Sequence, residues 1–201
     1  ETYPERKRRF DERVAAWEAA AATARAEGRQ PSGSRPWGDW RPSELYNAMI
    51  YPLIPYRIAG VIWYQGEANA NRADQYARLF PTLIQSWRAD WDSGTFPFLA
   101  VQLAPWDKGR QRSIEDIVAT PVESDWAELR EAQLLATQIL KKVGLAVITD
   151  LGDKDDIHPR KKELVGARLA LAARGIAYGE RVASSGPVFR SMSVSRGRAI
   201  L

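Results

Sequence analysis

Apolar residues follow two alternating patterns along the chain. Amphipathic stretches with a spacing of three to four residues predict helices, and short continuous apolar runs predict buried strands. Helices are expected over residues 5–28, 45–52, 72–92, 125–142 and 159–177. Strands are expected over residues 58–64, 96–103 and 144–149. Because strands and long helices alternate after residue 58, the pattern favours an α/β fold with a parallel sheet covered on both faces.

Proline positions and one apolar stripe add detail to these helices. Pro81 falls inside the helix over residues 72–92, where it is expected to bend or restart the helix. Pro159 suits the first turn of the last helix. In the helix over residues 125–142, four side chains are expected to face the core: Trp126, Leu129, Leu134 and Ile139.

The character of the sequence changes after residue 175. Residues 184–187 (SSGP) form a linker-like turn, and residues 188–201 alternate loosely as a β-segment does. We therefore predict one domain over residues 1–180, followed over residues 181–201 by a linker and the first strand of a β-rich module. Both chain ends are expected to be cuts through a longer protein.

Composition and charge limit the classes of function. The chain has 29 Lys and Arg residues against 25 Asp and Glu residues, a formal net charge of +4. Basic residues gather at positions 6–9 and 160–162, but both helical patterns also carry acidic residues, so solvated helix faces are favoured over nucleic-acid binding. The chain has no cysteine, which excludes disulfides, thiolate metal ligands and cysteine nucleophiles. No apolar run approaches the roughly 18–20 residues of a membrane-spanning helix.

The sharpest chemical signal is His158, the only histidine of the chain. It lies between a predicted strand and a predicted helix, and ligands bind at the C-terminal ends of strands in open α/β sheets. Acidic residues stand at positions 153, 155 and 156, where a carboxylate on a turn can reach the imidazole and orient it as a general base. From spacing alone, a solvated acidic turn with an incidental histidine stays open as the alternative. A zinc site is not expected with one histidine and no cysteine.

A second polar segment follows the first predicted strand. Gln65 offers an amide donor, Gly66 permits close backbone approach, and Glu67 and Asn69 add polar groups. Such donors could stabilise an oxyanion, and equally the segment could be a polar loop that caps the next helix.

Tryptophans divide into two groups. Trp63, Trp87, Trp91 and Trp126 lie on predicted strands or helices and are expected to be core or partly buried packing residues. The loop tryptophans are candidates for stacking on a sugar ring, although burial under the loop is an equal alternative: Trp37, Trp40 and Trp106.

The two polar segments together resemble a known family. Residues 60–69 (GVIWYQGEAN) are similar to the GVIWYQGESN signature of the sialate O-acetylesterase family, and residues 45–50 and 156–159 match it as well. The resemblance covers roughly residues 40–195. It implies an SGNH-type serine esterase with a flavodoxin-like three-layer α/β/α fold, here incomplete at the N-terminus. Further matching positions are Tyr76, Phe80, Pro81, Ile84, Trp87, Arg88, Lys162 and Gly166.

The resemblance also implies residue roles. His158 would be the catalytic base, and its acidic partner would be Asp155 or Asp156. Gln65 and Gly66 would help to build the oxyanion site, with Glu67 and Asn69 nearby as substrate-binding residues. The family's nucleophilic serine lies in a GQSNM-like motif, which this sequence lacks. The serine is therefore expected to precede residue 1, and this chain alone is expected to be inactive.

The function implied by the resemblance is carbohydrate O-acetylesterase activity. The partner would be an acetylated sugar, either a small molecule or a polysaccharide, and neither a metal nor an organic cofactor is needed. Members of the family are commonly secreted or periplasmic. Two alternatives remain: an acetylxylan or other polysaccharide deacetylase of the same fold, and a non-catalytic sugar-binding module that uses the three loop tryptophans.

Overall fold

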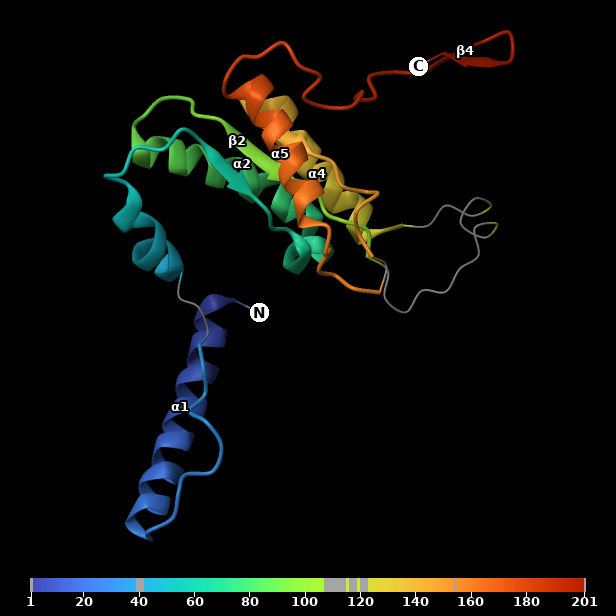
Figure 1. The fold of residues 1–201 in the computed structure, drawn as a ribbon. Coiled ribbons are helices and arrows are strands. Elements are labelled where there is room, and N and C mark those ends of the chain that lie inside the picture. Colours follow the sequence, from blue (N-terminus) through green and yellow to red (C-terminus); the bar gives the residue numbers. More distant parts are fainter. Residues whose placement is uncertain are drawn as a thin grey trace. The chain divides into compact units, whose positions relative to one another are not determined.

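The computed structural model describes residues 2–38, 42–106, 115, 119, 123–153 and 155–200, and Figure 1 shows its fold. The chain divides into two compact units, Glu1–Pro55 and Tyr56–Leu201. Each unit is described by itself below. None of the helices in the described part of the chain is long and apolar enough to cross a membrane.

The first unit consists of a long helix and the segment that returns along it. Helix α1 (Tyr3–Ala26) begins with Glu5 accepting hydrogen bonds from the N–H and hydroxyl of Thr2, at 2.7 and 3.0 Å. The indole N–H of Trp17 donates to the carbonyl oxygen of Ser32 at 3.3 Å, which ties the returning segment to the helix (Figure 1). Two short helices follow: the π-helix η1 (Tyr46–Ile50) and the 3₁₀ helix η2 (Tyr51–Leu53).

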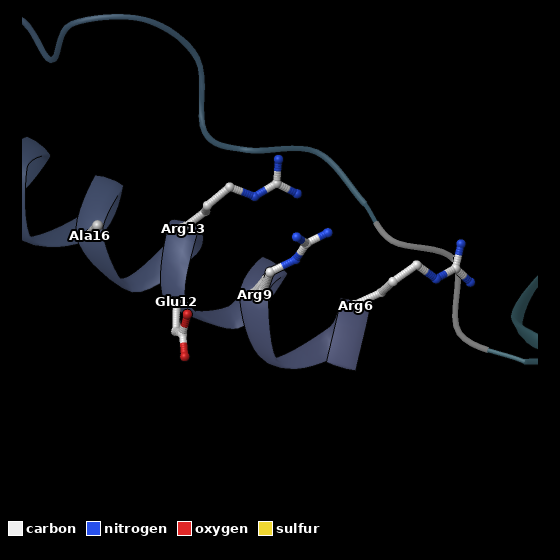
Figure 2. Close-up of a pocket in the computed structure, with 5 residues that line it drawn as sticks. All are labelled: Arg6, Arg9, Glu12, Arg13 and Ala16. Atoms are coloured by element: carbon white, nitrogen blue, oxygen red, sulfur yellow. The ribbon is translucent and has the colours of Figure 1, made fainter. Parts of the chain in front are cut away.

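One face of α1 is strongly basic. Figure 2 shows Arg6, Arg9 and Arg13 on this face, where they line an open cavity of about 530 Å³ together with Glu12 and Ala16. Residues three, four and seven positions apart share a helix face, which is why these three guanidinium groups lie near one another.

The second unit is built on a three-stranded parallel sheet. Its strands are β1 (Val61–Trp63), β2 (Phe98–Val101) and β3 (Val143–Ala146), in the order β1-β2-β3. The register pairs Val61 with Phe98 and Phe98 with Val143. The α/β fold expected from the sequence is therefore confirmed.

Helices connect and cover these strands. The 3₁₀ helix η3 (Glu67–Arg72) runs directly into α2 (Ala73–Trp91), and α4 (Asp125–Ile139) and α5 (Lys162–Ile176) follow. Helices α2 and α4 pack against each other, while α5 packs on β2 and β3 (Figure 1).

An aromatic cluster joins α2 to the sheet. The Trp63 ring lies 5.9 Å from that of Trp87 and 6.1 Å from that of Phe98, and Phe80 contacts the rings of both Trp63 and Phe98. Trp63 and Trp87 are therefore partly buried packing residues, within the expectation from the sequence. Fully buried aliphatic side chains extend this core toward the other helices: Ile84, Val101, Leu103, Leu129 and Ile148.

Helix positions differ from expectation at three residues. Helix α2 continues through Pro81 instead of restarting there; Pro81 is itself buried, so packing outweighs the missing N–H. Pro159 lies before α5, which begins at Lys162, so its assignment to the first helical turn was wrong. Ile139 was expected in the core and is 55% exposed, because it is the last residue of α4.

Two further differences concern strands. The segment predicted as a single β-strand near the C-terminus forms two, β4 (Ser193–Ser195) and β5 (Arg198–Ile200), paired antiparallel. Arg196 and Gly197 both have positive φ, at 50° and 72°, as a tight two-residue hairpin turn requires. The run that forms β1 was expected to be buried, but Ile62 is 70% exposed. Side chains alternate between the two faces of a strand, and α2 packs on the face that carries Trp63, not on the face that carries Ile62.

Candidate active site

Two loops that follow parallel strands meet at one pocket. Tyr64 and Glu67 come after β1, and His158 and Pro159 come after β3. With Ile157 and Lys162 they line a pocket of about 320 Å³. The C-terminal ends of parallel strands lie at the same edge of the sheet, which is where α/β proteins bind ligands. The fold thus brings the only histidine beside the polar segment that follows β1.

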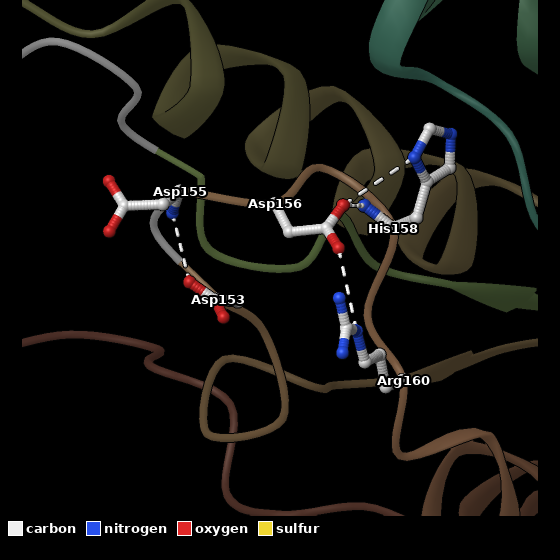
Figure 3. A network of polar contacts seen from close by, with 5 residues as sticks. All are labelled: Asp153, Asp155, Asp156, His158 and Arg160. Atoms are coloured by element: carbon white, nitrogen blue, oxygen red, sulfur yellow. Dashed lines mark hydrogen bonds and ion pairs between the residues drawn. The ribbon is translucent and has the colours of Figure 1, made fainter.

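The carboxylate of Asp156 lies beside the imidazole of His158. Its Oδ1 accepts a hydrogen bond from the backbone N–H of His158 at 2.9 Å and lies 3.6 Å from His158 Nδ1 (Figure 3). The second distance is longer than a hydrogen bond, and the His158 side chain is 88% exposed. The backbone hydrogen bond therefore holds the Asp156 carboxylate next to the ring.

The surroundings of Asp156 stabilise its negatively charged form. The N–H of His158, followed by the nearby charge of Arg160, holds the pKa of Asp156 below its usual range. Because the pKa is lowered in the folded protein, the carboxylate that can orient His158 is present at neutral pH and is lost only as the pH falls through that lowered pKa.

Asp155 is placed differently. Figure 3 shows its carboxylate directed away from His158, and its backbone N–H donates to Asp153 Oδ1 at 3.0 Å. The turn therefore presents Asp156, and not Asp155, to the imidazole.

The loop that carries His158 is anchored at its start by an ion pair. Arg168 on α5 binds both carboxylate oxygens of Asp150, at 2.5 and 2.7 Å, and also donates to the carbonyl of Val147 at 2.7 Å. Hydrogen bonding to Arg168 lowers the pKa of Asp150 to about 2. A bidentate pair of this kind fixes direction as well as distance.

Apolar packing also holds the loop that carries His158 in place. Leu151 is buried in a cluster with Val101, Ile148 and Val165, and Tyr64 packs against this cluster from the loop that follows β1. The two loops that form the pocket therefore pack against the same cluster of buried apolar side chains.

The predicted oxyanion residues lie together, beside the pocket rather than around the imidazole. Gln65 Nε2 donates to Asn69 Oδ1 at 2.8 Å, so these two side chains hold each other. Gly66 is buried at the start of η3, with φ 157°. Of the four predicted positions, Glu67 is the one that lines the pocket with His158.

A cation completes the pocket wall. The Lys162 ammonium lies 4.6 Å from the centroid of the Tyr64 ring, within the range of a cation–π contact. The Tyr64 hydroxyl is buried and has no hydrogen-bond partner among the described residues. Burial, and then the charge of Glu67, raises the pKa of this hydroxyl.

Sequence reasoning assigned no role to three residues that shape this region. Tyr64 was noted only within the family signature, and Lys162 only as a family match and as part of the basic run at 160–162, because their contact joins segments almost one hundred residues apart. Gln133, on α4, is fully buried and hydrogen-bonded to the backbone at the ends of β1 and β2. One signal could have found it: a polar residue four positions after Leu129 on the apolar stripe.

The three loop tryptophans that were candidates for stacking on a sugar ring lie in different environments. Trp106 packs against Trp126 with ring centroids 5.1 Å apart, and Trp126 donates its indole N–H to the carbonyl of Ala104 at 2.7 Å. Trp37 is 82% exposed, and Trp40 lies outside the described residues. Within the described part of the chain, no cluster of three or more His, Cys, Asp or Glu residues could hold a metal ion.

Known proteins are similar to this chain in sequence. A family model described as carbohydrate esterase, sialic acid-specific acetylesterase matches residues 31–174. The sialate O-acetylesterases of Homo sapiens and Pongo abelii are each 35% identical over 184 residues, covering 84% of this chain and 34% of each relative. The chain thus spans about a third of the length of these curated relatives.

A solved structure agrees with the sequence matches. The crystal structure of a carbohydrate acetylesterase from Xanthomonas citri superposes with a TM-score of 0.68 and 41% sequence identity, covering 90% of this chain and 38% of that one. The family match covers most of the chain, and two of the residues that the sequence pattern singled out, Glu67 and His158, line the pocket. The chain therefore belongs to the sialic acid-specific acetylesterase family of carbohydrate esterases.

Proposed function

We propose that the protein is a carbohydrate O-acetylesterase in which His158 is the catalytic base. One observation carries the proposal: His158, held beside Asp156, shares a pocket with Glu67 and Tyr64 at the C-terminal ends of parallel strands. The family resemblance gives this geometry its chemistry, because an oriented imidazole at such a position can activate a hydroxyl nucleophile.

The reaction would be acyl transfer in two steps. A serine hydroxyl attacks the acetyl carbonyl carbon while His158 takes its proton, and the protonated imidazole then gives that proton to the departing sugar oxygen. Water, activated by His158, attacks the acetyl-serine, and acetate leaves as the serine is regenerated. Gln65 and Gly66 would donate hydrogen bonds to the negative oxygen that forms in each step.

The nucleophile belongs, in this proposal, to a part of the protein outside residues 1–201. Two observations support this: the described lining of the pocket contains no serine, and the chain spans about a third of its curated relatives. The same proposal assigns residues 1–180 to the esterase domain and residues 181–201 to a following β-module. It also includes a secreted or periplasmic location for the protein.

The orienting acid is proposed to be Asp156. Its Oδ1 lies 3.6 Å from His158 Nδ1, whereas the carboxylate of Asp155 is directed away from the ring (Figure 3). Asp156 thus takes the part that the aspartate plays in a serine–histidine–aspartate triad, fixing the ring and stabilising its protonated form.

The substrate is proposed to be an acetylated acidic sugar of the sialic acid kind. Lys162 brings a positive charge to the pocket wall, and among the described residues no carboxylate lies within 4 Å of its ammonium group. A sugar carboxylate would supply that partner, while Glu67 would accept hydrogen bonds from sugar hydroxyls. A neutral acetylated polysaccharide is the second candidate, which the relative described only as a carbohydrate acetylesterase leaves open.

The decisive experiment compares His158→Ala with wild type in the complete protein. We expect the variant to lose acetyl release from an acetylated sugar by about 10³-fold or more, as other triads do when a member is removed. Lys161→Ala serves as the control, since it changes an exposed residue near the same loop that does not line the pocket. Wild-type rates in His158→Ala would refute the assignment of the base. A wild-type protein that binds sugars without hydrolysis would favour the non-catalytic binding module.

A further inference from the structure

Gln133 differs from every other fully buried side chain in the described core, because it is polar. It lies on α4 with no exposed surface. Its Oε1 accepts a hydrogen bond from the backbone N–H of Leu103 at 3.0 Å. Its Nε2 donates to the carbonyl oxygens of Val101 and Gln65, both at 3.3 Å. One side chain therefore joins α4 to the end of β2 and to the turn after β1.

The bond to Gln65 reaches the segment with the predicted oxyanion donors. The same carbonyl oxygen accepts a second hydrogen bond, from the Tyr76 hydroxyl at 3.2 Å. Two donors from two helices, α2 and α4, thus hold one carbonyl group. Buried polar networks with every group satisfied fix a single geometry, because any other arrangement leaves a polar atom unpaired.

Fixing that carbonyl also fixes the next N–H. No described peptide bond is cis, and the C=O and N–H of a trans peptide point in opposite directions. The carbonyl of Gln65 faces Gln133 and Tyr76, so the N–H of Gly66 points away from them. Within the described part of the chain this N–H makes no hydrogen bond. An unpaired backbone donor of fixed direction is what an oxyanion site requires.

The absence of a side chain at Gly66 makes this arrangement possible. A Cβ at this position would lie 3.2 Å from Gln133 Nε2 and 2.9 Å from Leu129 Cδ2. Glycine lets the turn approach α4 closely enough for the hydrogen bond from Gln133. The peptide bond between Gln65 and Gly66 is also flanked by Tyr64 and Glu67, and both of these line the pocket.

We propose that Gln133 is a positioning residue for hydrolysis: it holds the peptide between Gln65 and Gly66 so that the Gly66 N–H and the Gln65 side chain face the developing oxyanion. This inference rests on the proposed esterase function. Gln133 touches no substrate. It acts through the turn, and its contribution appears in the transition state, where the oxyanion exists, rather than in substrate binding.

The test measures kcat and KM separately for Gln133→Leu in the complete protein. Leucine has similar bulk and removes all three hydrogen bonds. We expect kcat to fall about 10–100-fold, as small misplacements of catalytic groups do, with KM within about twofold of wild type. The matched control is Gln102→Leu, which removes a side-chain hydrogen bond from the end of β2 to the Arg130 carbonyl on the same helix. The control should lower thermal stability and leave kcat unchanged.

A second variant keeps the test informative if Gln133→Leu does not fold. Tyr76→Phe removes the other donor to the Gln65 carbonyl and retains the ring, which packs against Phe80 at 5.3 Å. We expect a fall in kcat of about 3–10-fold, the range of one neutral hydrogen bond, again with KM unchanged. In the double variant the two effects should be non-additive, because both donors act on one carbonyl group.

The outcomes separate this inference from the proposed function. If wild type hydrolyses acetyl esters and His158→Ala does not, but Gln133→Leu and Tyr76→Phe keep the wild-type kcat, the positioning role is wrong and the esterase function stands. If Gln133→Leu and Gln102→Leu lose kcat equally, the effect is general destabilisation and the inference fails. A wild-type protein without esterase activity overturns both.

Discussion

Alanine at position 66 is expected to destabilise the protein through two separate effects. The added Cβ would lie 2.9 Å from Leu129 Cδ2 and 3.2 Å from Leu103 Cδ2, well inside the 3.5–4.0 Å at which carbon atoms normally pack. Both leucines are fully buried, so neither can move aside freely, and overpacking of this kind costs about 1–3 kcal/mol. The backbone, with φ 157° and ψ −23°, adds about 1–3 kcal/mol for a residue with a side chain.

Together these effects amount to about 2–6 kcal/mol, which for a domain of this size lowers the Tm by about 2–4 °C per kcal/mol. Thermal unfolding followed by circular dichroism measures the change. The matched control is Gly94→Ala. Gly94 also has positive φ, at 71°, but a Cβ there would meet nothing within 4 Å, so only a backbone cost of about 1–2 kcal/mol is expected. A Tm of Gly66→Ala equal to or above that of Gly94→Ala would refute the close approach of this turn to α4.

Two further predictions concern the pocket. Asp156→Asn should lower kcat by about 10²–10⁴-fold, because a triad needs the charge that orients and stabilises the imidazolium, while the kcat of Asp155→Asn should stay within about twofold of wild type. Acetate release at neutral pH measures both rates, and the reverse order of effects would assign the acid to Asp155. Lys162→Gln should raise KM about 10-fold or more for an acetylated acidic sugar, because a charge-assisted hydrogen bond is lost, and leave KM for a neutral acetylated sugar unchanged; equal effects on both sugars would contradict recognition of a carboxylate by Lys162.

Much of the fold was predictable because its signals are local. Apolar runs and helical periodicity are properties of a few adjacent residues, so the order of strands and helices, and with it the parallel sheet, followed from the sequence. The exposure of Ile62 did not, because the residue belongs to an apolar run and its burial depends on whether another element packs on its face of β1. The start of α5 was misplaced for a related reason: Pro159 is compatible with a first helical turn, but it is buried in the loop that precedes α5.

The candidate site was predictable in part for the same physical reasons. A single histidine after a strand, preceded by carboxylates, indicated a loop that lines a pocket together with Glu67. The choice between Asp155 and Asp156 depends on side-chain direction within a turn, which spacing alone does not set. Gln133 was missed because its partners are backbone atoms of other segments, and sequence patterns carry no record of which carbonyl groups a buried amide will meet.

The outer position of β1 has a practical consequence for anyone who handles the protein. In the part of the chain that the structure describes, β1 has one neighbouring strand, so its other edge carries a row of backbone donors and acceptors that no described strand pairs; the exposed side chain of Ile62 lies on the same strand. Such a row is a template for a strand from a second molecule. Where this edge of β1 is accessible, self-association through it will rise with protein concentration. Melting temperatures and reaction rates of variants should therefore be compared only at matched, low protein concentrations.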